Sequence, residues 1–84
     1  MDFMETLFVS ALPFKVTDQE LRSLFQPYGE IRSITIHADW EKATYEPYAH
    51  IEMNNADAAI RALDGLILGP TYLRVNKLIN LDKA

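Results

Sequence analysis

Residues 7–14 read Leu7-Phe8-Val9-Ser10-Ala11-Leu12-Pro13-Phe14. The first four alternate in character, and a strand turns successive side chains to opposite sides of its sheet. Leu7 and Val9 can therefore face a core while Phe8 and Ser10 face away from it. We expect this strand to carry an aromatic ring on the side of the sheet opposite the core.

A second stretch with the same alternation, Tyr48-Ala49-His50-Ile51, follows about forty residues later. Ala49 and Ile51 suit a core, while Tyr48 and His50 point to the other side. If this strand lies beside the first, Phe8, Tyr48 and His50 form one flat aromatic patch. Unstacked bases of single-stranded RNA bind on patches of this kind.

The rest of the sequence predicts helices and further strands around these two. Strands are expected over 6–10, from Ile31 with Ile34 and Ile36 inward, over 48–53, and over 72–76 with Leu73 and Val75 inward. A first helix, capped by Thr17 and Glu20 and ended at 27–29, follows the first strand. A second helix, capped by Asn54 or Asn55 and ended at Gly65, follows the third strand. This order predicts an α+β fold, the ferredoxin-like βαββαβ sandwich. Its four-stranded antiparallel sheet would carry both helices on one face and leave the other face bare.

Length and composition limit the classes of protein to consider. At 84 residues the chain predicts one domain over 1–84, with a core of about residues 5–78. The absence of cysteine excludes disulfides, thiolate metal sites and cysteine nucleophiles. No apolar run approaches the roughly 18 residues of a membrane span, and the first five residues lack a basic signal-peptide start. We therefore expect an intracellular protein without a membrane partner, cytoplasmic, or nuclear in a eukaryote.

The charge balance has the opposite sign to that of a typical phosphate-binding protein. Eight basic and twelve acidic residues give a formal net charge of −4. Most non-specific affinity for nucleic acids comes from neutralised phosphates, so nucleic-acid-binding domains are more often basic. An RNA-binding function would therefore depend on local patches rather than on the net charge.

Two motifs resemble those of the RNA recognition motif family. Residues 7–12 resemble its six-residue motif, with Ala11 in place of the usual Asn, and residues 46–53 resemble its eight-residue motif. In the second motif, Tyr48, Ala49 and Ile51 fit the family pattern. The resemblance extends over residues 5–78, and it implies the βαββαβ fold and binding of single-stranded RNA.

The resemblance also implies roles for individual residues. Phe8 and His50 occupy the positions that stack on bases, and Tyr48 occupies the position that packs against a sugar; His50 departs from the usual Phe or Tyr. We expect additional contacts to RNA backbone or base edges from the last and second strands: Arg74, Asn76 and Lys77 on the last strand, and Thr35 and His37 on the second.

Three departures from the family pattern bear on function. Glu46 stands where the family has a basic residue that meets a phosphate, Pro47 replaces the usual Gly, and Glu52 adds a carboxylate to the same face. A carboxylate repels phosphate, most strongly at low ionic strength. These residues favour weaker RNA binding or a second hypothesis, in which an RNA recognition motif fold binds a protein through its acidic sheet face or its helices.

The sequence offers no set of residues for catalysis. It lacks a nucleophile with a matching base and orienting group, a phosphate-binding glycine loop and a paired-carboxylate cleft. A metal site would have to use His37 and His50 with Glu46 or Glu52. Two histidines without cysteine are a weak indication of such a site. We therefore expect no enzyme activity, no metal and no cofactor.

The first hypothesis is thus a binder of single-stranded RNA, or of single-stranded DNA, with modest affinity and specificity. A homodimer or a protein partner would raise its affinity through effective concentration. Trp40, in the polar loop over 38–46, would contact a base or a partner, or fold onto the domain's own surface.

Overall fold

The computed structural model describes residues 4–12, 16–37 and 47–78. Its elements follow the predicted order, with a short hairpin added before the last strand. They are β1 (Glu5–Ser10), α1 (Asp18–Phe25), the 3-10 turn η1 (Gln26–Tyr28), β2 (Ile31–His37), β3 (Tyr48–Met53), α2 (Ala56–Leu63), β4 (Ile67–Leu68), β5 (Thr71–Tyr72) and β6 (Arg74–Lys77).

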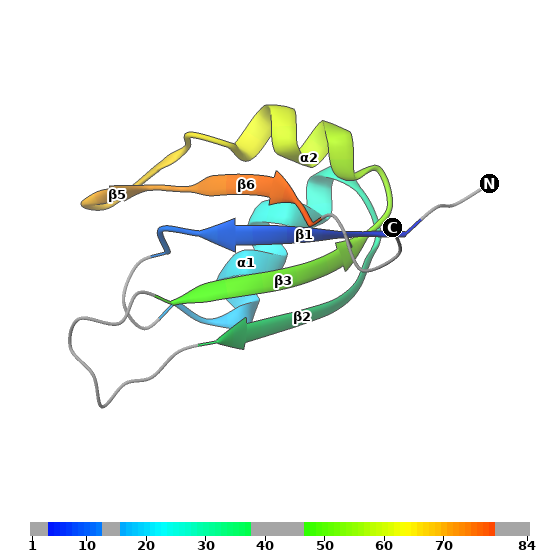
Figure 1. Ribbon diagram of the computed structural model, residues 1–84, viewed down its shortest axis with the longest axis horizontal. Coiled ribbons are helices and arrows are strands. Elements are labelled where there is room, and N and C mark those ends of the chain that lie inside the picture. Colours follow the sequence, from blue (N-terminus) through cyan, green and yellow to red (C-terminus); the bar gives the residue numbers. More distant parts are fainter. Residues whose placement is uncertain (1–3, 13–15, 38–46, 79–84) are drawn as a thin grey trace, which may run out of the picture.

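The main sheet is antiparallel and has the strand order β2-β3-β1-β6. Both helices pack against the same face of it: in the view of Figure 1, α1 lies behind the strands and α2 runs along the β6 edge. The predicted ferredoxin-like arrangement is therefore confirmed. One consequence matters for function: neither helix covers the other face of the sheet.

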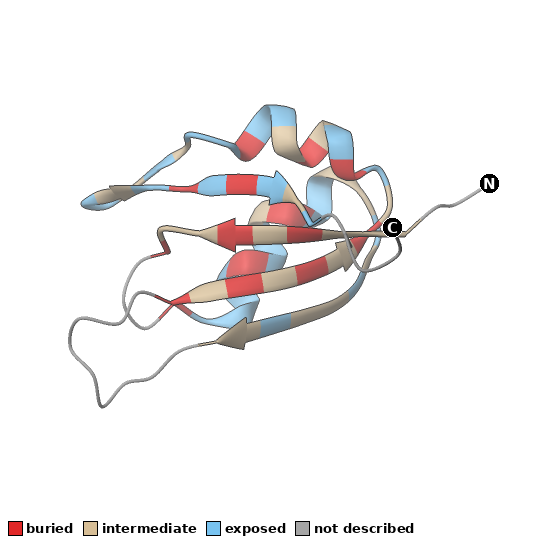
Figure 2. Cartoon of the chain, in the orientation of Figure 1, coloured by how far each residue is buried: buried red, intermediate tan, exposed pale blue. Residues whose placement is uncertain are grey.

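The core lies between the sheet and the two helices. Inward-facing strand residues alternate with partly exposed ones along β1 and β3, as the red and tan bands of Figure 2 show. The largest fully buried side chains come from strands and helices alike: Phe25, Leu7, Leu21, Ile51, Met53, Leu73, Val9 and Val75. Burial of apolar area, at about 25 cal/mol per Å², is the main driving force for this packing.

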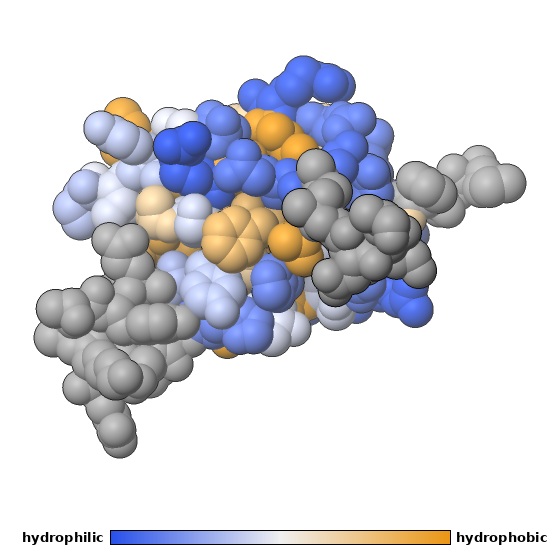
Figure 3. All heavy atoms as spheres, viewed as in Figure 1, coloured by the Kyte–Doolittle hydropathy of each residue, from blue (hydrophilic) through white to orange (hydrophobic). Residues whose placement is uncertain are grey.

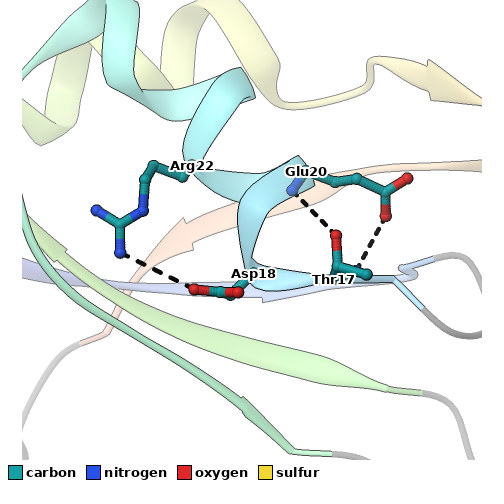
Figure 4. A network of polar contacts seen from close by, with 4 residues as sticks. All are labelled: Thr17, Asp18, Glu20 and Arg22. Atoms are coloured by element: carbon teal, nitrogen blue, oxygen red, sulfur yellow. Dashed lines mark hydrogen bonds and ion pairs between the residues drawn. The ribbon is translucent and has the colours of Figure 1, made fainter.

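The predicted capping box starts α1 (Figure 4). The Thr17 hydroxyl accepts a hydrogen bond from the Glu20 backbone N–H at 3.2 Å, and the Glu20 carboxylate accepts one from the Thr17 N–H at 2.9 Å. Asp18 and Arg22 form an exposed ion pair one turn apart, at 4.0 Å. Two backbone donors that a helix start leaves unsatisfied thereby gain acceptors.

A bulge in β2 was not predicted. Ile31 pairs with Met53, but the next pair joins Ser33 to Glu52, so Arg32 is an extra residue. Without the bulge, Ile31 and Ile34 would face opposite sides, because their separation is odd. Both isoleucines pack against the core. The bulge therefore keeps both in the core and sets the register of the residues that follow.

The predicted last strand over 72–76 is wrong at its start. Tyr72 pairs with Ile67 in the β4–β5 hairpin, and the strand that joins the main sheet begins at Arg74. Ser10 is the last residue of β1 and pairs with Arg74, and the chain turns away at Ala11, whose φ is +58°. Residue 72 therefore has no strand beside it in the main sheet. Leu73 and Val75 are buried, as predicted.

The second helix starts directly after Asn55, one of the two predicted capping residues. Asn55 occupies the N-cap position with a left-handed backbone, but its side chain makes no capping hydrogen bond. Instead the Asn55 amide donates to the Tyr28 carbonyl at 3.1 Å, and the Asn54 side-chain oxygen accepts from the Glu30 N–H at 2.7 Å. These asparagines join the start of α2 to the turn that precedes β2.

Candidate nucleic-acid interface

One row of side chains crosses the bare face from edge to edge. Thr35 of β2 pairs with His50 of β3, His50 with Phe8 of β1, and Phe8 with Asn76 of β6. The four side chains therefore lie on one line across all four strands. We call this set, Thr35, His50, Phe8 and Asn76, the central row.

A second row lies beside it. His37 pairs with Tyr48, and Ser10 pairs with Arg74. The His37 and Tyr48 rings stack with their centroids 4.8 Å apart and an angle of 17° between their planes. The Nε2 atom of His37 is buried and has no hydrogen-bond partner among the described residues. Buried polar atoms usually have a hydrogen-bond partner, and this nitrogen has none within the described residues.

The rings of the two rows form one cluster. The Phe8 ring centroid lies 5.4 Å from that of Tyr48 and 5.9 Å from that of His50. The His37 and His50 rings lie 5.0 Å apart in an edge-on arrangement. These separations are typical of aromatic pairs in contact. The four rings thus form a continuous surface rather than isolated rings. We call them the ring cluster: Phe8, His37, Tyr48 and His50.

The same face is apolar in its middle. In the space-filling view of Figure 3, hydrophobic side chains gather near the centre, over β1, and hydrophilic ones surround them. All four members of the ring cluster are half-buried. The arrangement offers apolar area at its centre and polar groups at its margin.

Arg74 is the cation of the two rows. It is 60% exposed, and its Nε lies 3.6 Å from Oδ1 of Asp64, just beyond the end of α2. The same Asp64 oxygen accepts a hydrogen bond from the Val75 N–H at 2.9 Å. The carboxylate therefore holds the edge strand and draws the Arg74 side chain toward the margin of the sheet.

Lys77 lies on the other side of the sheet. It pairs with the inward-facing Leu7, and its Nζ contacts the carboxylates of Asp57 at 2.8 Å and Glu5 at 3.2 Å. Hydrogen bonds to these carboxylates raise the pKa of Lys77. The structure thus gathers seven of the eight predicted site residues on one face and places the Lys77 ammonium beside α2.

The Asp57–Lys77 contact predicts a pH-dependent stability. The hydrogen bond from Lys77, then its charge, lower the pKa of Asp57. A carboxyl whose folded-state pKa is lowered stabilises the fold above its unfolded pKa, about 3.9, and loses that contribution as pH falls through the folded value. We expect Asp57→Asn to lower the free energy of unfolding slightly at pH 7, in urea titrations, and to have little effect at about pH 2.

A double-mutant cycle provides the control for this ion pair. In a Lys77→Met background, the pH dependence of the Asp57→Asn effect should shrink, because the cation that lowers the pKa is gone. An equal effect at both pH values in the wild-type background would contradict the assignment.

A third row on the same face consists of Thr6, Glu52 and Ser33, and the sequence predicted only part of it. Glu52 was expected on this face, and it lies there between Thr6 and Ser33. The hydrogen bond from the Ser33 hydroxyl to Oε1 of Glu52, 3.0 Å long, was not foreseen. This hydrogen bond depends on the β2 bulge, which no local residue pattern predicts.

Several sequence-based expectations concern residues 38–46. Trp40 and Glu46 belong to this segment, which lies outside the described residues. Within the described ranges, no group of three or more His, Cys, Asp or Glu side chains is arranged to hold a metal ion. None of the described helices combines the length and apolar character needed to span a bilayer.

Comparison with known families agrees with the geometry. A family model described as RNA recognition motif matches residues 7–70. The chain belongs to the RNA recognition motif family. The matched region contains most of β1, both helices, β2 and β3, and hence all four members of the ring cluster.

Relatives in this family differ in length. The chain is 36% identical over 75 residues to a Nostoc protein named "Putative RNA-binding protein RbpD", and the match covers 86% of this chain and 80% of that protein. It is 30% identical over 84 residues to the poly(U)-binding-splicing factor rnp-6 of Caenorhabditis elegans, covering 94% of this chain but only 11% of the factor. The second match therefore concerns one segment of a much larger protein.

Solved structures show the same fold. The chain superposes on the SXL-lethal protein–RNA complex with a TM-score of 0.74 and 31% identity, covering 88% of this chain and 47% of that one. The RNA-binding protein PG1 gives a TM-score of 0.77 with 24% identity, covering 90% and 95%. The ferredoxin-like fold is thus shared with both.

Proposed function

We propose that the chain binds single-stranded RNA on the bare face of its sheet. The observation that carries the proposal is the ring cluster, which lies on the central and second rows and is left uncovered by both helices. Stacking on aromatic rings requires no particular base sequence, because every base has a π-face. The family membership and the RNA-binding names of relatives support this reading.

Seven of the eight residues of the two rows have a role in the proposal; Ser10 has none. Phe8 and His50 stack bases, and Tyr48 packs against a ribose. Arg74 and Asn76 contact backbone or base edges at the β6 margin, while Thr35 and His37 do so at the β2 margin. Lys77 is left out, because its ammonium already binds Asp57 and Glu5 on the helix side.

Stacking sets the scale of the affinity. Each stacked base contributes about 1–3 kcal/mol, so two stacks supply roughly 2–6 kcal/mol. This corresponds to a dissociation constant no tighter than about tens of micromolar before other contacts. The two rows carry one full cation, Arg74, and the third row adds the Glu52 carboxylate. We therefore propose modest affinity and a weak electrostatic contribution.

An amide NMR titration tests the proposal. With an eight-nucleotide RNA of mixed sequence at low salt, we expect shifts at the ring cluster and along β6, and none on the outer face of α1. The affinity should fall with salt at a slope of about −0.7 per phosphate contacted, hence a shallow slope for one or two contacts. A single-stranded DNA of the same sequence reveals any contribution of the 2′-hydroxyls.

A second candidate function is protein binding, and one feature favours it. Ile67 and Tyr72 are cross-strand neighbours on the β4–β5 hairpin and are 71% and 63% exposed. Paired apolar side chains at this exposure are a feature of interaction surfaces. The same titration separates the candidates: absence of shifts at millimolar RNA would refute RNA binding and direct the search to protein partners of the hairpin.

A further inference from the structure

The third row places a carboxylate beside the surface proposed to stack bases. Glu52 lies two residues along β3 from His50, about 6.8 Å away at the usual rise of an antiparallel strand. Its neighbours in the row are Thr6 and Ser33, both uncharged. The carboxylate therefore lies about one base width from the central row, on the same face.

The Glu52 carboxylate is held but not neutralised. Oε1 accepts the Ser33 hydroxyl hydrogen bond at 3.0 Å. Among the described residues, no cationic group forms an ion pair with Glu52. A carboxylate is an acceptor with about four lone-pair sites, and one hydrogen bond leaves most of them available. Its position is thus fixed by Ser33 while its capacity to accept hydrogen bonds remains.

A carboxylate on this face has opposite effects on the two parts of a nucleotide. It repels a phosphate, but it accepts hydrogen bonds from the N–H groups at the edge of a base. A base stacked on His50 directs its edge to the side of the ring, and Glu52 lies in the row beside it. We propose that Glu52 reads the edge of that base and selects guanine; this inference rests on the proposed RNA-binding function.

The preference for guanine follows from the donors that each base presents. Guanine carries N1–H and the N2 amino group side by side, so it can donate two hydrogen bonds to one carboxylate. Adenine and cytosine each offer one amino group on the corresponding edge. Uracil offers a single N3–H between two carbonyl oxygens, which the carboxylate repels. The expected order of affinity is therefore guanine first, adenine and cytosine next, and uracil last.

Inosine makes the test specific, because it is guanosine without the N2 amino group. We would measure binding of uridine octamers that carry one central guanosine, inosine or uridine, by fluorescence anisotropy at fixed salt. The wild-type chain should bind the guanosine octamer at least about fivefold tighter than the inosine octamer, the lower end expected for a bidentate base contact. Comparable affinity for guanosine and inosine would overturn the inference while leaving RNA binding intact.

Glu52→Gln adds a test in which the affinities for two RNAs should change in opposite directions. The amide side chain has nearly the same shape but removes the charge and one acceptor. Binding of the guanosine octamer should weaken several-fold, and binding of the all-uridine octamer should stay equal or strengthen, since a repulsive charge is lost. Uniform strengthening of all three would show that Glu52 acts only on phosphates, and would overturn the inference.

Glu30→Gln is the matched control for charge. Glu30 is exposed and lies before β2, outside the three rows, and its backbone rather than its side chain bonds to Asn54. This variant changes the net charge equally, so it should leave the ratio of guanosine to inosine affinity unchanged. If no octamer binds even at millimolar concentration, the proposed function itself fails, and this inference fails with it.

Discussion

Phe8→Ala should weaken RNA binding about five- to 150-fold, the largest effect expected of any single substitution on the bare face. Phe8 stands in the central row between His50 and Asn76, and its ring contacts two other rings of the cluster. Removing one stacking ring costs about 1–3 kcal/mol of binding free energy. Fluorescence anisotropy with an eight-nucleotide RNA measures the change directly.

Two further variants separate stacking from loss of structure. Phe8→Tyr keeps a ring at the same place and should bind within a few-fold of wild type. Tyr72→Ala removes an exposed aromatic ring from the β4–β5 hairpin, away from the three rows, and should leave the affinity nearly unchanged. If Phe8→Ala binds as tightly as wild type while remaining folded, stacking on Phe8 is wrong.

Gly29→Ala should lower the free energy of unfolding by about 2–3 kcal/mol, the larger part of what overpacking in a tight site usually costs. A Cβ at residue 29 would overlap the Asn54 backbone oxygen and lie 2.6 Å from its side-chain oxygen. Asn54 also joins the residue before β2 to the start of α2: its side-chain oxygen accepts a hydrogen bond from the Glu30 N–H, and its own N–H donates to the Glu30 carbonyl. Accommodating the methyl group therefore means moving backbone.

Gly69→Ala is the informative comparison. Gly69 has a φ of +59° in the turn between β4 and β5, and no atom lies within 4 Å of an added Cβ. Its substitution costs only the left-handed backbone preference, about 1–2 kcal/mol. Chemical denaturation should thus rank Gly29→Ala as the more damaging change. The reverse ranking would mean that Asn54 can move away from the added methyl group at little cost in free energy.

Three members of the ring cluster could be predicted because their grouping depends on local alternation and one pairing. Phe8, Tyr48 and His50 sit at outward positions of strands whose inward positions are apolar, so a shift of one residue would expose the core set. The βαββαβ order then makes β1 and β3 neighbours. The structure has them paired with Phe8 directly opposite His50. The roles of these residues toward RNA stay predictions.

Lys77 shows a residue at which the same alternation predicts the opposite of the expected role. It lies two residues after the buried Val75 and three after Arg74, so a strand that continues to residue 77 turns it toward the helices. Only the approach of α2 decides that Asp57 meets the Lys77 ammonium at 2.8 Å. Likewise, the contact between Ser33 and Glu52 depends on a bulge one residue earlier.

The sequence by itself therefore determined the order of the elements apart from the β4–β5 hairpin, the start of α1 and the face on which each residue of β1 and β3 lies. Alternation, capping and turn residues act over a few positions, and their energetics can be read locally. The tertiary structure alone decided the β2 register, the end of the main sheet at Arg74 and the partners of every charged side chain that bonds to a distant residue. These features join segments far apart in the chain, and they follow from packing of the whole core rather than from any one stretch of it.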